Sequence, residues 1–207
     1  MSLADEAELI EPVFEAAGDR VHVIGHSYGG AVALKAALAR PARLRSLILF
    51  EPVLFAVLMA EDPQQPAARE IVAVRDDTVA AVDRGDLDTA GGRFADYWMG
   101  AGTWSRMPAS RRQAVSRAMS KVKAEWLAVF TEPTPLSAFA ALDVPTLCLV
   151  GSNSPASSRG VARLLAKTLP SVTTVEIDGV GHMAPVTHPD RVNAVIASYL
   201  EDVTASG

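Results

Sequence analysis

The segment that most constrains the fold of this chain is Val21–Gly30, which reads VHVIGHSYGG. A short apolar run typical of a buried strand leads directly into a G-x-S-x-G turn centred on Ser27, and an Ala- and Leu-rich helical pattern follows. Such a turn forces a strained backbone conformation on its serine, so residues two positions away must be small. Gly25 and Gly29 meet that requirement. The segment predicts a strand, a tight turn and a helix whose N-terminus faces Ser27.

Short apolar runs recur along the chain and are separated by helical patterns. The runs expected to form buried strands are Val21–Ile24, Leu47–Phe50, Thr146–Val150 and Val172–Ile177. The expected helices are Ala31–Arg40, which Pro41 ends, Val161–Leu169, which Pro170 ends, and Arg191–Leu200. An opening helical segment, residues 3–17, carries one apolar stripe and is expected to kink at Pro12. Strands that alternate with helices predict an α/β fold with a parallel sheet.

Residues 56–141 interrupt this alternation. They contain no strand-like run, and their composition is helical and polar with frequent Gly and Pro. We therefore expect an α/β core made of residues 1–55 and 142–207, and a helical lid or cap made of residues 56–141. The lid is expected to lie over the carboxyl edge of the sheet.

One of the four histidines, His182, lies in a glycine-rich loop after the last expected strand. The other three have simpler explanations. His22 lies inside an expected strand, His188 precedes a proline at a helix start, and His26 must point its side chain away from Ser27. A neutral imidazole can take a proton from a serine hydroxyl and later return it to a leaving group. His182 is therefore the candidate general base.

The serine turn and the His182 loop together resemble the serine-nucleophile branch of the α/β-hydrolase superfamily, and the resemblance covers essentially the whole chain. It implies a serine hydrolase in which Ser27 is the nucleophile, His182 the base, and the backbone N–H of Tyr28 one donor of the oxyanion hole. Members of this superfamily usually have several strands and a helix before the serine turn. The resemblance therefore implies an N-terminally truncated form of the fold, about 60–80 residues short by ordinary element lengths.

Two positions compete for the carboxylate that the resemblance implies beside His182. Many α/β-hydrolases carry it in the loop after the next-to-last strand, but here that loop, Gly151–Ser158, has no Asp or Glu, and Ser154 stands at the expected position. The other position is one strand earlier, where Glu51 follows the run Leu47–Phe50. A charged residue that ends an apolar run usually faces water. The acid-free loop nevertheless favours Glu51 as the third member of a Ser-His-Glu triad.

The aromatic residues of the 56–141 segment bear on the substrate. Such clusters more often pack a small helical lid than select a ligand, yet a lid over the sheet must line the pocket. The expected pocket residues are Phe55, Trp98, Trp104 and Met183, which indicate an apolar small-molecule substrate. An ester is the first expectation, with thioester and carbon–carbon bond hydrolysis open. The alternative is a non-catalytic, hydrolase-like protein that binds a small molecule or a partner chain.

Composition excludes several classes of partner. The net charge of −5 and the absence of a dense Lys/Arg cluster argue against nucleic acid, and no apolar run is long enough to span a bilayer. The single cysteine, Cys148, supports neither a disulfide framework nor a zinc site, and no metal or other cofactor is expected.

An N-terminus without a signal-peptide pattern favours a cytoplasmic location. Val21–Ile24, expected to be an unpaired edge strand, favours a homodimer.

Overall fold

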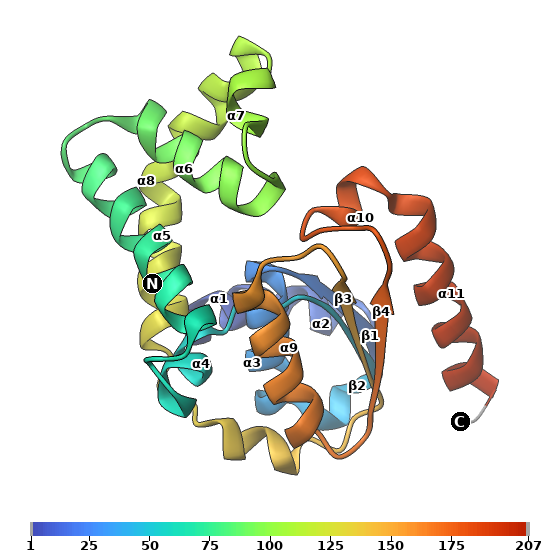
Figure 1. The fold of residues 1–207 in the computed structure, drawn as a ribbon. Helices are drawn as coiled ribbons and strands as arrows, with labels where there is room; N and C mark the ends of the chain where they lie inside the picture. Colours follow the sequence, from blue (N-terminus) through green and yellow to red (C-terminus); the bar gives the residue numbers. More distant parts are fainter. Residues whose placement is uncertain (1, 206–207) are drawn as a thin grey trace.

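The computed structural model describes residues 2–205. It contains one four-stranded parallel sheet in the order β1-β2-β3-β4, which confirms the predicted α/β fold (Figure 1). The strands are β1 (Val21–His26), β2 (Leu44–Phe50), β3 (Thr146–Gly151) and β4 (Val172–Ile177). All four expected strands are present, and they differ from the prediction only at their ends.

Helices cover both faces of the sheet. They are α1 (Leu3–Leu9), α2 (Glu11–Ala16), α3 (Tyr28–Ala39), the 3-10 turn η1 (Pro41–Arg43), α9 (Ala156–Thr168), α10 (Ala184–Thr187) and α11 (Pro189–Ala205). Side chains alternate along a strand, so Leu47 and Leu49 face the layer of α1, α3 and α9, whereas Ile48 and Phe50 face α11. This two-sided burial explains why β2 is apolar along most of its length.

The opening segment consists of two helices that meet at Ile10. The sequence predicts a kink at Pro12, and the break indeed lies just before this residue. Pro12 occupies the first turn of α2, where a missing N–H and a fixed φ are tolerated. The proline therefore starts a second helix here and does not bend a continuous one.

Residues 56–141 connect β2 to β3 through helices and loops, with no strand anywhere in that fully described range. Its elements are α4 (Phe55–Glu61, which starts one residue earlier), α5 (Pro66–Asp83), α6 (Leu87–Met99), α7 (Thr103–Arg106), α8 (Ala109–Thr131) and the 3-10 helix η2 (Leu136–Ala141). Helices α5, α6 and α8 pack against one another and rise beyond the carboxyl ends of the strands, while η2 returns the chain to the start of β3 (Figure 1). We call residues 56–141 the helical insertion.

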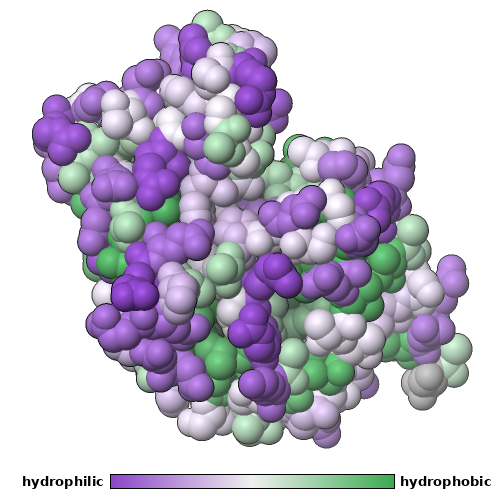
Figure 2. Space-filling view, in the orientation of Figure 1, coloured by the Kyte–Doolittle hydropathy of each residue, from purple (hydrophilic) through white to green (hydrophobic). Residues whose placement is uncertain are grey.

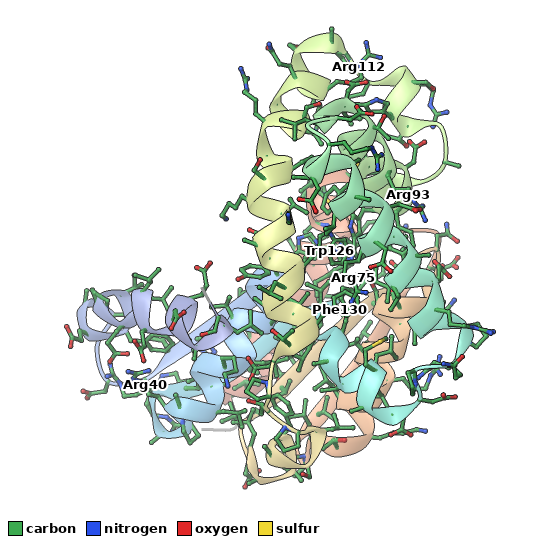
Figure 3. All side chains as sticks on the ribbon, turned by 90° about the vertical axis from the view of Figure 1, so that its left-hand side faces the viewer. Arg40, Arg75, Arg93, Arg112, Trp126 and Phe130 are labelled. Carbon is green, nitrogen blue, oxygen red and sulfur yellow. The ribbon has the colours of Figure 1, made fainter. Side chains whose placement is uncertain are left out.

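Figure 3 views the molecule from the side of α5 and α8. Trp126 and Phe130 on α8 lie beside Arg75 on α5, and the Arg75 guanidinium stacks 4.4 Å above the Phe130 ring. Trp126 and Trp98 belong to the same continuous apolar core as the sheet residues. The helical insertion therefore packs on the α/β core as part of one hydrophobic interior.

Strand β1 pairs with β2 along one edge only, and no strand lies on its other edge among residues 2–205. Its side chain Ile24 is 56% exposed, which is unusual for an isoleucine within a strand of a parallel sheet. The strand that leads into the serine turn is thus an edge strand in the described chain.

Candidate active site

The turn after β1 places Ser27 in a sterically strained conformation, with φ 56° and ψ −122°. Gly25 makes this turn possible, because a Cβ at that position would stand 2.6 Å from the Gly29 carbonyl oxygen. The prediction that Gly29 is also sterically required was wrong, since a Cβ there would meet no atom within 4 Å beyond its chain neighbours and the nearby backbone of α3. The second crowded position is Gly30, where a Cβ would approach Pro52 at 3.0 Å.

Tyr28, the expected oxyanion donor, is the first residue of α3. Backbone N–H groups in the first turn of a helix have no carbonyl partner within it, so the Tyr28 N–H is free to face a ligand beside Ser27. The Tyr28 hydroxyl donates a hydrogen bond of 3.4 Å to a Glu6 carboxylate oxygen. Burial raises the pKa of Tyr28 to about 12, so this hydroxyl stays protonated.

Three side chains from three different loops form one hydrogen-bonded line. His182 Nδ1 lies 2.6 Å from Glu51 Oε2, and His182 Nε2 lies 2.9 Å from Ser27 Oγ. The side chains of His182 and Glu51 are only 2% and 0% exposed. The carboxylate fixes the imidazole tautomer in which Nδ1 carries the proton and Nε2 accepts from the serine hydroxyl. Glu51 also has a positive φ of 46°, so both ends of the line are held by strained turns.

The second oxygen of Glu51 is bound by the loop in which the sequence offers no acid. Glu51 Oε1 accepts hydrogen bonds from the Gly151 N–H at 2.7 Å and from the Ser154 hydroxyl at 2.5 Å. A carboxylate with no exposed surface needs such donors, because each unpaired charged oxygen would carry a large desolvation cost. Ser154, at the position where an acid was expected, thus supports the Glu51 carboxylate.

His26 contributes an interaction that the sequence does not reveal. Its Nε2 donates a hydrogen bond of 2.9 Å to the backbone carbonyl of His182, and its ring packs edge-on against Phe50 at 5.6 Å. Burial and then the neighbouring His182 lower the pKa of His26 to about 4, so the ring is neutral near pH 7. The hydrogen bond to the His182 carbonyl ties the His182 loop to the end of β1, and the His26 ring lies 4.9 Å from the His182 ring.

Two cavities lie beside this line of residues. The first has a volume of about 50 Å³ and reaches Ser27. Its lining is mostly apolar and comes from the core and from α6 and α8; it consists of Ser27, Tyr28, Val53, Phe55, Phe94, Trp98, Val122, Glu125, Trp126 and Val129. We call it the serine cavity.

The second cavity has a volume of about 700 Å³ and lies between α6 and the segment around α10. In Figure 2 the surface is hollowed between the upper helices of the insertion and this C-terminal segment. Its polar lining includes Glu70, Arg93, Asp96 and Asn153, and Gly181 and Met183 flank His182 along its wall. We call it the outer cleft.

The structure distributes the expected pocket residues over these two spaces. Phe55 lines the serine cavity, Met183 lines the outer cleft, and Trp98 lines both. The Trp98 ring also covers His182, with ring centroids 4.2 Å apart. Trp104 lines neither cavity. It packs against Gly91 and Gly92 of α6, where a Cβ would meet its ring at 2.8 and 3.1 Å.

No cluster of three or more His, Cys, Asp or Glu residues suited to a metal ion occurs among residues 2–205. Within the same residues, every helix is too short or too polar to cross a membrane.

Comparison with known proteins places this site in a family. The alpha/beta hydrolase family model matches residues 2–195. A hydrolase from Pseudomonas aeruginosa is 24% identical with a TM-score of 0.74, covering 96% of this chain and 72% of its own. An alpha/beta hydrolase from Sphaerobacter thermophilus is 26% identical with a TM-score of 0.69, covering 97% and 75%. A thermophilic esterase from Thermogutta terrifontis is 22% identical with a TM-score of 0.68, covering 98% and 73%.

No curated protein matches the chain. The family match spans nearly all of the sequence and includes both the serine turn and the His182 loop. This chain therefore belongs to the α/β-hydrolase family and is a hydrolase.

Proposed function

We propose that the protein is a serine hydrolase that cleaves esters or closely related carbonyl compounds with a Ser27-His182-Glu51 triad. The observation that carries this proposal is the continuous line of hydrogen bonds from Glu51 through His182 to Ser27. Both distances lie within the range of a working nucleophile–base–acid arrangement. Similarity to a thermophilic esterase is consistent with an ester substrate.

The geometry supports a two-step reaction. Ser27 Oγ attacks the substrate carbonyl carbon while its proton moves to His182 Nε2, and the buried Glu51 carboxylate stabilises the imidazolium. The Tyr28 N–H at the start of α3 donates to the oxyanion of the tetrahedral intermediate. His182 then protonates the departing alcohol and leaves an acyl group on Ser27. Water attacks this ester, again with His182 as base, and releases the acid.

The helical insertion serves as a lid in this proposal. Its helices α6 and α8 supply Phe94, Trp98 and Trp126 to the serine cavity, and Trp98 covers His182. Apolar walls of this kind exclude water and strengthen the electrostatic interactions that stabilise the transition state.

A fluorophosphonate probe tests the proposal, because it reacts covalently with an activated serine. We expect labelling of the wild-type chain and hydrolysis of p-nitrophenyl acetate, and we expect Ser27→Ala to lose both while keeping its circular dichroism spectrum. A folded wild-type chain that is neither labelled nor active would instead support the alternative of a non-catalytic binding protein.

A further inference from the structure

Resting on the proposed function, we infer that the substrate is an ester of a short apolar acid with a larger, polar alcohol. The acyl group occupies the serine cavity, and the alcohol occupies the outer cleft. The inference combines the position of the two spaces relative to His182 with their size and chemistry.

His182 decides which part of the substrate occupies which space. The departing alcohol must receive a proton from His182 Nε2, so it leaves on the histidine side of Ser27, whereas the acyl group stays bonded to the serine. Both chain neighbours of His182, Gly181 and Met183, line the outer cleft, and neither lines the serine cavity. Ser27 lines the serine cavity and not the outer cleft.

The wall between the two spaces is Trp98, which lines both and whose ring lies tilted against the His182 ring. Its side chain is held from several directions: the Trp126 ring lies 6.4 Å away in a stacked arrangement, and the Phe94 ring packs edge-on at 6.2 Å. A side chain packed in this way keeps one position, so the two parts of the substrate are sorted on opposite sides of one indole ring.

The size of the serine cavity limits the acyl chain. A volume of about 50 Å³ holds roughly three to four water-sized groups, because each water-sized sphere takes up about 10–15 Å³. The back of the cavity is closed by core side chains, with Phe55 0%, Val129 2% and Trp126 4% exposed. A long chain therefore has no path through the interior, whereas an acetyl to butyryl group matches the available space.

The two spaces also differ in polarity. The serine cavity is lined mainly by aromatic and aliphatic side chains, which favour an apolar acyl group. The outer cleft contains carboxylates, an amide and the Arg93 guanidinium, whose Nε forms an ion pair with Asp77. Groups of this kind offer hydrogen bonds of both polarities to a hydroxylated or charged alcohol.

The acyl part of the inference is tested with p-nitrophenyl esters of acetate, butyrate and octanoate, which share one leaving group. We expect kcat/KM for octanoate to be at least about 10-fold below that for acetate, since one methylene that does not fit an apolar pocket already costs roughly 10-fold. The alcohol part is tested with glyceryl monobutyrate against pentyl butyrate, for which we expect the higher kcat/KM on the glyceryl ester.

Two lid variants make the acyl test specific to the cavity. Trp126→Ala enlarges the serine cavity and should raise the octanoate-to-acetate ratio of kcat/KM by roughly 10-fold. Trp104→Ala is the matched control, since it removes the same side chain from the same insertion at a position that lines neither cavity. Val122→Phe, on the half-buried face of α8, narrows the cavity and should lower the butyrate-to-acetate ratio. If Trp126→Ala fails to fold, Val122→Phe alone tests whether the serine cavity limits the acyl chain.

The outcomes separate this inference from the proposed function. If no ester is hydrolysed and Ser27 is not labelled, both fail. If Ser27 is labelled and octanoate is hydrolysed as well as acetate, the proposed function stands and the acyl part of the inference is overturned. Ratios that do not change in both Trp126→Ala and Val122→Phe overturn it as well. Equal rates on glyceryl and pentyl butyrate overturn the alcohol part.

Discussion

Mild acid should destabilise this protein through His26. Burial, and then the adjacent His182, hold the pKa of His26 at about 4 in the folded chain, whereas a solvated histidine titrates near 6.5. As the pH falls from 7 to 5, the unfolded chain takes up a proton on this ring and the folded chain does not. Protonation therefore favours the unfolded state. The stability that the folded chain has above pH 6.5 is reduced, through His26, as the pH falls toward 4.

The magnitude follows from the two pKa values. A change in the pKa of His26 from 6.5 to about 4 on folding corresponds to about 3 kcal/mol in the free energy of unfolding. About 2 kcal/mol of this is lost between pH 7 and pH 5. The His26 ring is partly exposed, so solvent screening makes this the upper end, and we expect about 1–2 kcal/mol.

Urea unfolding at pH 7 and pH 5 measures this loss when the wild type is compared with His26→Gln. Glutamine does not titrate, and its side-chain amide can still donate to the His182 carbonyl that His26 Nε2 binds. All other titrating groups are the same in both proteins. We expect the free energy of unfolding of the wild type to fall by about 1–2 kcal/mol more than that of the variant. Equal losses in the two proteins would refute the buried neutral state of His26.

Three further predictions concern the acid, the serine turn and the edge strand. Glu51→Ala should lower kcat by about 10⁴-fold. Adding Ser154→Asp should restore part of the activity, because Ser154 Oγ lies 2.5 Å from the Glu51 carboxylate. Steady-state kinetics that find no recovery would argue against this geometry. Gly25→Ala should lower the free energy of unfolding, measured in urea, by about 1–3 kcal/mol, whereas Gly29→Ala, in open space, should lower it little. Equal losses in the two variants would contradict the steric argument. We propose that the 207-residue chain forms a two-fold dimer through the open edge of Val21–His26; a monomer at micromolar concentration by analytical ultracentrifugation would contradict it.

The fold could be predicted because its signals are local. Strands buried on both faces give continuous apolar runs, and prolines mark the helix ends, so element types were clear while their ends moved by a few residues. The serine turn combines a strand, a glycine and a helix within ten residues, which few other structures require. Glu51 could be placed beside His182 only through the family resemblance and the acid-free loop Gly151–Ser158, because nothing in the sequence near Glu51 indicates a partner 131 residues away.

The parts that sequence reasoning missed depend on backbone atoms and on packing. His26 bonds to a main-chain carbonyl 156 residues later, and a backbone partner leaves no mark in the sequence. Trp104 was expected in the pocket because aromatic residues cluster in the insertion. It packs instead in a space left by Gly91 and Gly92, a local fit that composition cannot reveal. The steric role assigned to Gly29 belongs to Gly30, since only the path of the chain past Pro52 decides which glycine is crowded.

The placement of the helical insertion has a consequence for how the protein folds. Strands β2 and β3 are neighbours in the sheet, yet one ends at Phe50 and the other begins at Thr146. Bringing them together closes a long loop, an entropic cost that slows the pairing relative to local contacts. The β1–β2 half carries Ser27 and Glu51, and the β3–β4 half carries His182. The three side chains of the proposed triad therefore meet only when the two halves dock. Recovery of the proposed serine reactivity during refolding should report this late step and lag behind the recovery of helical structure.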